Sequence, residues 1–288
     1  MKKGVSRDQF QARFSDDAKC LHYLFEQKTK GMKECPCCKQ EFKYYPVSGR
    51  KCYVCGSCGN QIYPMANTIF EGSTTKLTIW FGVIHEFYGT RIGVSAKYIE
   101  RMFGVTYKTA WRMANKVRSI MAPMDDGMIS GIIEIDESFF GGIKPLNKQG
   151  GKGIGDKMVV FGMLQRGGRA IALHVSNKDK ETLLPIIKNH ITSDSLIYSD
   201  GYAVYNDVSS MGYRHVVVTQ KPGRRHKEGE WTCGIESLWS YIKGPLLGTH
   251  RSVSRKHFQS YLNEFVFRYN MNKREEDYLE IMLERLVA

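Results

Sequence analysis

The second half of the chain alternates between strand-like and helix-like segments, and their order predicts an α/β fold. Runs rich in β-branched and aromatic residues predict strands, and amphipathic runs predict helices. The segments in order are three strands at 131–140, 157–164 and 169–175, a helix at 179–191, a strand at 196–200, a short helix near 202–208, a strand at 215–218 and a helix around Glu236. The order βββαβαβα predicts a ribonuclease-H-like mixed sheet flanked by helices.

The first half of the chain predicts two smaller modules in front of this sheet. Paired cysteines indicate a zinc ribbon, and three helix-like segments indicate a helix-turn-helix. A break at 123–127, which contains proline and glycine, separates these modules from the sheet. We therefore expect an N-terminal helix and zinc ribbon at 1–72, a helix-turn-helix-like region at 73–124, and a ribonuclease-H-like domain with C-terminal helices at 125–288.

The composition favours a polyanionic partner. The 288 residues carry 42 Lys and Arg against 29 Asp and Glu, a net charge of +13. DNA is the first candidate, because basic side chains displace the counterions of phosphates, and a merely basic surface is the alternative. The sequence contains no stretch of about 18 uncharged apolar residues, so it predicts no membrane span. No signal sequence is visible at the start. We therefore expect a cytoplasmic, reducing location, in which the eight cysteines are metal ligands or free thiols.

Two Cys-x-x-Cys pairs, sixteen residues apart, match the spacing of a four-thiolate Zn²⁺ ribbon. The favoured zinc ligands are Cys35, Cys38, Cys55 and Cys58. A glycine follows the last thiolate, where a tight knuckle requires a positive φ. Cys37 and Cys52 leave a shifted register open, because Cys52 and Cys55 also form a Cys-x-x-Cys pair. Cys20 and Cys233 are expected to be free thiols.

Residues 76–121 form the predicted helical region. In it, Ser95 is expected to cap a second helix, Gly104 to supply a turn, and Thr106 to cap a third helix. This order is typical of a DNA-binding helix-turn-helix. The basic residues of the third helix are Lys108, Arg112, Lys116 and Arg118. The polar face of this helix could enter a DNA major groove, and a helical bundle with a solvated basic face is an equal alternative.

Three acids fall where the predicted fold brings two strands and a helix together. Asp136 lies within the first strand, Asp200 ends the fourth strand, and Glu236 lies on the helix that follows. The first and fourth strands are neighbours in this fold, so the carboxylates could bind two metal ions about 3.5–4 Å apart. Oxygen ligands favour Mg²⁺ or Mn²⁺, which would activate a water or 3′-hydroxyl and stabilise the leaving oxygen of a phosphodiester.

Each of these acids also has a simpler interpretation. Asp136 could be an exposed acid at a sheet edge, with Glu134 or Glu137 as the working carboxylate. Glu134 shares the strand face of Asp136, whereas Glu137 points to the opposite face. Asp200 could belong to a plain turn and Glu236 to a solvated helix surface. The joint placement of three acids on the expected elements favours the metal site.

Several basic residues of this half could contact DNA. Lys243 follows Glu236 by seven residues, about two helical turns, so both lie on one side of the helix. Its cation could contact a phosphate beside the scissile bond, and a solvated lysine is the alternative. The other candidate DNA contacts are Arg224, Arg225, Arg251 and Lys256. Trp239 is expected to pack in the core rather than to stack on bases.

Motifs spread over most of the chain occur together. They are Cys35-Pro36-x-Cys38, Tyr53-x-Cys55-x-x-Cys58, Glu134-x-Asp136-Glu137, Ser199-Asp200-Gly201-Tyr202, Ile235-Glu236-x-x-Trp239-x-x-x-Lys243 and Gly248-Thr249-His250-x-x-Val253-Ser254-x-x-His257. With these motifs the chain resembles DDE-type transposases of bacterial insertion sequences, and within them the ISXO-like branch, which has an amino-terminal zinc ribbon. One position departs from the pattern: where such proteins often have asparagine three residues before the glutamate, this chain has Cys233.

The resemblance implies an enzyme that binds the terminal inverted repeats of an insertion sequence, cleaves to free 3′-hydroxyl ends, and transfers these ends into target DNA. It also implies action as a homo-oligomer on DNA. Two other functions stay open. One is a non-catalytic DNA-binding regulator built on the zinc ribbon and the helix-turn-helix, and the other is a ribonuclease-H-like nuclease without strand transfer. The presence of all three acids and Lys243 disfavours the regulator.

Overall fold

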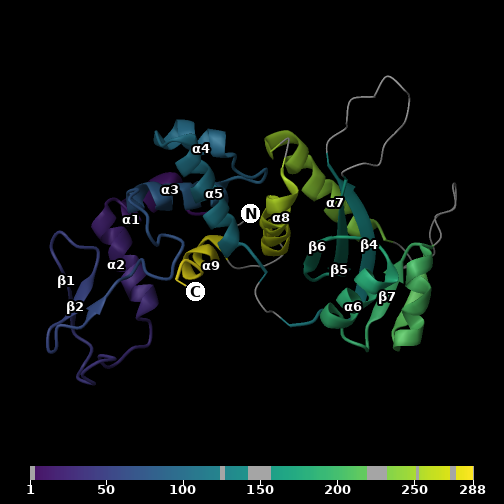
Figure 1. Ribbon diagram of the computed structural model, residues 1–288, viewed down its shortest axis with the longest axis horizontal. Coiled ribbons are helices and arrows are strands. Elements are labelled where there is room, and N and C mark those ends of the chain that lie inside the picture. Colours follow the sequence, from purple (N-terminus) through teal and green to yellow (C-terminus); the bar gives the residue numbers. More distant parts are fainter. Residues whose placement is uncertain are drawn as a thin grey trace. The chain divides into compact units, whose positions relative to one another are not determined.

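The computed structural model of the protein describes residues 4–123, 127–141, 157–218, 232–250, 253–272 and 277–287. The chain forms two compact units (Figure 1). The first comprises Met1–Thr90, Val94–Ile120 and Glu275–Ala288, and the second comprises Arg91–Gly93 and Met121–Arg274. The sequence groups the last segment with the sheet domain at 125–288, whereas the structure places it in the first unit.

The first unit is mainly helical. Its helices are α1 (Arg7–Arg13), α2 (Asp17–Lys28), α3 (Leu77–Gly89), α4 (Ala96–Phe103), α5 (Tyr107–Ile120) and α9 (Tyr278–Glu284). The N-terminal helix that the sequence predicts within 1–72 is divided into α1 and α2. The division falls at Asp16, whose carboxylate accepts a hydrogen bond from the Lys19 N–H at 2.8 Å and so caps α2.

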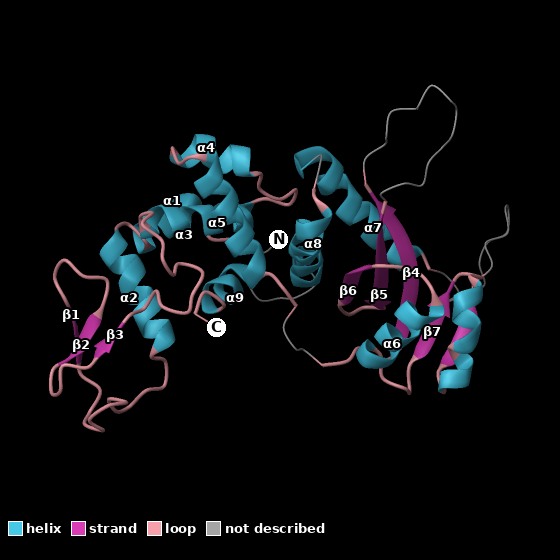
Figure 2. Ribbon diagram, viewed as in Figure 1, coloured by secondary structure: helices cyan, strands magenta, loops and turns pink. Residues whose placement is uncertain are grey.

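Three short strands form a small antiparallel sheet in the first unit. They are β1 (Tyr44–Pro46), β2 (Tyr53–Cys55) and β3 (Gln61–Ile62), in the order β1-β2-β3. Figure 2 shows that loops make up most of the chain around these strands. Strands β1 and β2 lie in the stretch that joins Cys38 to Cys55, and strands of this length do not form a stable sheet by themselves.

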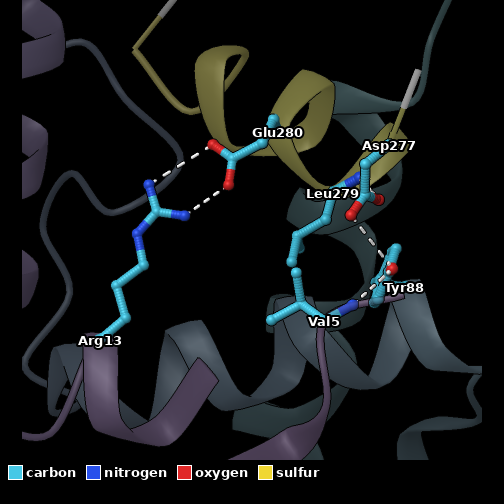
Figure 3. Close-up of polar contacts among 6 residues, drawn as sticks. All are labelled: Val5, Arg13, Tyr88, Asp277, Leu279 and Glu280. Carbon is cyan, nitrogen blue, oxygen red and sulfur yellow. Dashed lines mark hydrogen bonds and ion pairs between the residues drawn. The ribbon is translucent and has the colours of Figure 1, made fainter. Parts of the chain in front are cut away.

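The last helix, α9, packs against α3 and is tied to the N-terminal segment by polar contacts (Figure 3). The Arg13 guanidinium of α1 forms an ion pair with the Glu280 carboxylate. The Tyr88 hydroxyl donates to Asp277 Oδ2 at 3.3 Å and accepts a hydrogen bond from the Val5 N–H at 3.1 Å. Two parts of the chain that are far apart in sequence therefore complete the same unit.

The second unit contains a five-stranded mixed sheet. Its strands are β4 (Ile132–Phe140), β5 (Met158–Gln165), β6 (Ala170–Val175), β7 (Leu196–Ser199) and β8 (Arg214–Val217). The order across the sheet is β6-β5-β4-β7-β8, with β4 antiparallel to β5 and parallel to β7. This arrangement confirms the predicted ribonuclease-H-like fold, in which the first strand lies between the second and the fourth.

Helices cover both faces of this sheet (Figure 1). They are α6 (Lys180–His190), α7 (Cys233–Pro245) and α8 (Phe258–Asn272), with short 3₁₀ turns at Ala203–Asp207, Ser209–Met211 and Arg255–His257. On one face, α7 and α8 pack with Phe140, and on the other face α6 packs with Ile133 and Ile135. Alternate residues of β4 thus face two different cores. No helix in the described part of the chain is long and apolar enough to cross a membrane.

Candidate functional site

The first candidate site is a cluster of four thiols in the first unit. The Sγ atoms of Cys35, Cys38, Cys55 and Cys58 all lie within 4.8 Å of one another, so the cluster could hold a metal ion. Cys37 is exposed and Cys52 is buried, and neither belongs to the cluster. The structure therefore brings together the favoured set of thiols and not the shifted register.

The two halves of this cluster have matching backbone geometry. The Cys35 N–H donates to the Gln40 carbonyl at 2.8 Å, and the Cys55 N–H donates to the Asn60 carbonyl at 2.8 Å. Each half is thus a tight knuckle that starts at its first cysteine. Four thiols presented by two such knuckles could hold a structural zinc ion.

The turn of each knuckle requires a left-handed residue. Gly59 has a φ of 76°, as predicted for the residue after the last thiolate, and Lys39 occupies the same place in the first knuckle with a φ of 59°. The N–H groups of Cys58 and Ser57 lower the pKa of Cys55. The second turn therefore favours the thiolate form of Cys55, which is the form that binds metal.

The second candidate site is the helix pair α4 and α5. The Ser95 hydroxyl accepts a hydrogen bond from the Tyr98 N–H at 3.1 Å, and the Thr106 hydroxyl accepts one from the Thr109 N–H at 3.3 Å. Gly104 ends α4 in the left-handed region, with a φ of 63°. Both predicted caps and the predicted turn are confirmed, so α4 and α5 have the connection of a helix-turn-helix.

The basic residues of α5 separate into two kinds. Those at least partly accessible to solvent are Lys108, Arg112 and Lys116. They are four residues apart and so lie on one side of the helix. Arg118 is only 2% exposed; its Nη2 donates to the Val94 carbonyl at 2.9 Å, and its guanidinium lies 5.3 Å from the Phe87 ring centroid. Arg118 therefore supports the core and does not belong to the polar face.

The third candidate site is an acidic pocket of about 310 Å³ in the second unit. Its lining residues are Ile135, Asp136, Asp200, Gly201, Val218, Thr232 and Glu236. In the parallel pairing of β4 with β7, Glu134 lies opposite Tyr198. Two residues further along each chain, Asp136 and Asp200 therefore come to the same level of the sheet. Glu236 reaches the pocket from the first turn of α7.

Hydrogen bonds orient two of the pocket's carboxylates. Asp200 Oδ1 accepts the Tyr202 N–H at 3.0 Å, and Asp136 Oδ2 accepts the Trp239 indole N–H at 2.8 Å. Burial raises the pKa of Asp136, and the nearby carboxylates of Asp200 and Glu236 raise it further. A cation bound between these groups would relieve this repulsion.

The pocket fits a divalent metal ion by its donor set. Among the described residues, the cysteine cluster is the only group of three or more ligand atoms gathered closely enough to hold a metal ion, so the three carboxylates are not gathered in that way. Carboxylate oxygens are nevertheless the ligands that Mg²⁺ and Mn²⁺ prefer. A cation would draw the carboxylates together, because it cancels the repulsion between them.

The two neighbouring acids of β4 have different surroundings. Glu134 is 1% exposed; its Oε1 accepts from Arg166 Nε at 2.8 Å, and its Oε2 accepts from the Ile235 N–H at 2.9 Å. Glu137 points to the opposite face, where burial raises its pKa to about 7. Neither acid lines the pocket, so the structure favours Asp136 over both.

Two lysines flank the end of β4 beyond Asp136. Lys243 Nζ lies 5.5 Å from the ring centroid of Phe140, and Lys178 Nζ lies 5.7 Å from that of Phe139. Because adjacent strand residues point to opposite faces, the two lysines lie on opposite faces of the sheet. Lys243 is a predicted site residue. Lys178 was missed, because a single lysine in the loop before α6 belongs to no sequence pattern.

The remaining predicted contacts have different outcomes. Arg224, Arg225 and Arg251 lie outside the described residues. Lys256 is exposed in the turn Arg255–His257. Cys233, which departs from the pattern of the resembling transposases, is exposed at the first position of α7.

The sheet order and the acidic pocket define the class of the second unit, a ribonuclease-H-like domain. The sequence profile of the ISXO2-like transposase domain matches residues 128–270. The chain is 25% identical to an uncharacterized protein in transposable element ISH50 of Halobacterium salinarum. That alignment spans 281 residues and covers 88% of this chain and 91% of that protein. The chain is also 30% identical to an uncharacterized transposase-like protein of Haemophilus influenzae. This second alignment spans 98 residues and covers 33% of this chain and 76% of that protein. The chain therefore belongs to the ISXO2-like transposase family.

A distant structural likeness accompanies these relatives. A chain of the simian T-cell lymphotropic virus intasome in complex with PP2A regulatory subunit B56 gamma matches with a TM-score of 0.29 and 14% identity. The match covers 62% of this chain and 66% of that chain, just under two thirds. The fold class rests on the strand order of the sheet and not on this likeness.

Proposed function

We propose that the protein is an active DNA transposase. It cleaves a phosphodiester at the terminal inverted repeat of an insertion sequence and joins the freed 3′-hydroxyl to target DNA. The observation that supports this reaction most strongly is the meeting of Asp136, Asp200 and Glu236 in one pocket. A transposase that uses metal ions needs clustered carboxylates where the strand is cut, and this pocket supplies three.

The carboxylates of Asp136, Asp200 and Glu236 would hold Mg²⁺ or Mn²⁺. When bound, a pair of such ions activates the attacking oxygen and stabilises the leaving oxygen of an in-line displacement. The chain's own contribution is to orient these ligands. The Tyr202 N–H holds the carboxylate of Asp200, and the Trp239 indole holds that of Asp136.

The lysines on either side of β4 would hold the DNA strand at this pocket. Lys243 and Lys178 offer cations on the two faces of the sheet, and phosphates flanking the scissile bond are their natural partners. Lys178 also lies 4.3 Å from the Tyr202 ring centroid, next to the 41% exposed Phe139. A cation beside an exposed aromatic ring is typical of surfaces that bind single-stranded nucleic acid by stacking and charge.

The first unit would recognise the element's ends. Helix α5 presents Lys108, Arg112 and Lys116 on one side, and a helix after a glycine-containing turn is the part of a helix-turn-helix that enters the major groove. The net charge of +13 supports binding to the DNA backbone. Since an insertion sequence has two ends, we expect two or more copies of the chain to act together on DNA.

The catalytic part of this proposal is tested on DNA that carries the element's ends, with Mg²⁺ present. Asp200→Asn and Glu236→Gln are expected to reduce cleavage and joining to the background level, because each removes one carboxylate charge from the pocket. Glu181→Gln is the matched control, since Glu181 is an exposed acid in the first turn of α6. Full activity in either pocket variant would contradict the proposal. Cleavage without joining would identify a nuclease, and specific binding without cleavage would identify a regulator.

The recognition part is tested by comparing two arginines of α5 in an end-binding assay. Arg112→Ala is expected to weaken binding to end DNA without changing thermal stability, because Arg112 is exposed. Arg118→Ala is expected to lower stability by about 1–3 kcal/mol, because it leaves the buried Val94 carbonyl without this donor. Unchanged DNA affinity in Arg112→Ala would exclude this side of α5 from the interface.

A further inference from the structure

We propose that Trp239 and Glu134 are positioning residues that fix Asp136 and Glu236 relative to each other. Trp239 of α7 donates to Asp136 of β4, and Glu134 of β4 accepts from the Ile235 N–H of α7. Each element therefore supplies one side chain that holds the other element, and we call these two hydrogen bonds the β4–α7 contact. The inference rests on the proposed function, in which Asp136 and Glu236 bind the same metal ions.

The Trp239 half of the contact is closely packed. The Trp239 side chain is 5% exposed, and its indole N–H reaches Asp136 Oδ2 at 2.8 Å. Gly162 of β5 lies beneath the indole, and a Cβ at this position would come within 2.4 Å of the ring. Glycine at 162 therefore allows the indole to lie against the sheet, where it faces the Asp136 carboxylate.

In the other half of the contact, Glu134 of β4 caps the N-terminus of α7. Thr232 precedes α7 but makes no side-chain capping hydrogen bond. Glu134 Oε2 takes this role by accepting the Ile235 N–H at 2.9 Å, in the first turn of α7. A Cβ at Gly234 would lie 2.9 Å from the same oxygen, so any larger residue at this position would displace the Glu134 carboxylate. Arg166 pairs with the other carboxylate oxygen at 2.8 Å and so supplies a cation beside this buried acid.

The spacing of the two hydrogen bonds gives the contact its positioning effect. Glu134 and Asp136 are two residues apart on one strand face, a distance of about 7 Å. Ile235 and Trp239 are four residues apart on the helix, a rise of about 6 Å. The spacing on the strand therefore matches the spacing on the helix, so both hydrogen bonds can form together. Two points of attachment restrict sliding and rotation of α7 along β4. Glu236 follows Ile235 directly, so its position depends on this attachment.

The test measures metal binding rather than activity. Mn²⁺ binding to the full-length, zinc-loaded protein is followed by calorimetry without DNA. Trp239→Phe, which removes the donor but keeps an aromatic ring, is expected to weaken Mn²⁺ binding about 10- to 100-fold, as loss of a partner that orients a metal ligand does in other sites. Trp80→Phe is the matched control, because Trp80 is also a buried indole and donates to Ser73 Oγ at 2.9 Å in the first unit. The control is expected to keep the Mn²⁺ affinity.

Glu134 supplies a second comparison that separates positioning from direct metal binding. Glu134→Gln keeps an oxygen acceptor for the Ile235 N–H, whereas Glu134→Ala removes it. We expect the alanine variant to lose several-fold more Mn²⁺ affinity than the glutamine variant. Equal losses would mean that the charge of Glu134 binds metal itself, and this result would overturn its assignment as a positioning residue.

Two other results would also overturn the inference, and they differ in what else they affect. If Trp239→Phe keeps Mn²⁺ affinity within twofold of the unchanged protein, the β4–α7 contact does not position the ligands, and the proposed metal site stands. If Asp136→Asn and Glu236→Gln leave Mn²⁺ binding unchanged, the carboxylates are not a metal site. The proposed catalytic function then falls together with the inference.

Discussion

Three acids of β4 lie within four residues of one another, yet each has its own role. Glu134 is buried and hydrogen-bonded to α7, Asp136 lines the pocket, and Glu137 is partly buried on the opposite face of the sheet. Alternation along a strand separates Glu137 from the other two. It does not separate Glu134 from Asp136, because both point to the same face. Only the position of α7 decides that Glu134 caps a helix while Asp136 meets the other carboxylates.

Glu137 should make the stability of the protein depend on pH. Burial raises its pKa from 4.5 to about 7, so the folded protein keeps a proton that the unfolded chain releases. The stability from this group is therefore complete below about pH 4.5 and is lost as the pH rises through about 7. We expect the melting temperature of Glu137→Gln to fall less between pH 5 and 8 than that of the unchanged protein, with both measured in the absence of divalent ions. An unchanged slope would show that Glu137 does not titrate in this range.

Lys178 and Lys243 should each contribute one phosphate contact. Replacing either by alanine is expected to reduce the slope of log affinity against log salt concentration by about 1, because one fewer counterion is released on binding. Binding of end DNA at several salt concentrations measures this slope. Lys188→Ala is the control, since Lys188 is an exposed lysine near the end of α6, away from the pocket lining. A slope in Lys178→Ala equal to that of the control would remove Lys178 from the DNA path.

At the scale of single elements, capping and knuckle signals were predicted accurately. Ser95 and Thr106 cap the helices they were expected to cap, and Gly104 and Gly59 occupy left-handed turns. These features depend on hydrogen bonds between residues two to four positions apart, which the sequence specifies directly. The Asp16 cap that begins α2 is also a local feature, but the prediction of a single N-terminal helix did not include it.

The zinc ribbon should depend on its metal for its structure. Its strands are two or three residues long, and most of the module is loop (Figure 2), so four metal–thiolate bonds would supply much of its stability. We expect Cys55→Ser to lose stoichiometric zinc and hydrogen-exchange protection in β1 and β2. Cys37→Ser is the control and should keep both, because Cys37 lies outside the thiol cluster. Full zinc content in Cys55→Ser would contradict the ligand set.

At the scale of the whole molecule, the chain leaves the first unit after Ile120 and returns to it with α9. The sheet unit is therefore an insertion in the sequence of the helical unit. The position of a segment along the chain therefore does not show to which of the two units it belongs. Residues 275–288 follow the ribonuclease-H-like segment along the chain, but α9 packs on α3 and contacts the N-terminal segment (Figure 3).

Ending the chain at Asn272 should therefore destabilise the first unit. The truncation removes the buried side chains of α9, and we expect hydrogen exchange to accelerate in α1 and α3 while β4 and β5 keep their protection. Arg13→Ala is the milder control. It breaks only the ion pair to Glu280, whose side chains are 42% and 48% exposed, and should cost at most about 1 kcal/mol. Equal exchange in α1 and α3 before and after truncation would contradict the assignment of α9.

The sequence by itself determined the order of the elements in the sheet unit, the set of clustered thiols, the caps at Ser95 and Thr106, and the three acids of the pocket. These follow from periodicity, from spacing within a few residues, and from a strand order that places the first and fourth strands side by side. The tertiary structure alone decided that Arg118 is buried, that Lys178 lies over the Phe139 ring of β4, that α9 belongs to the first unit, and that Trp239 and Glu134 join β4 to α7. Each of these depends on burial and hydrogen bonding between segments far apart in the chain, and such contacts are set by packing rather than by any local pattern.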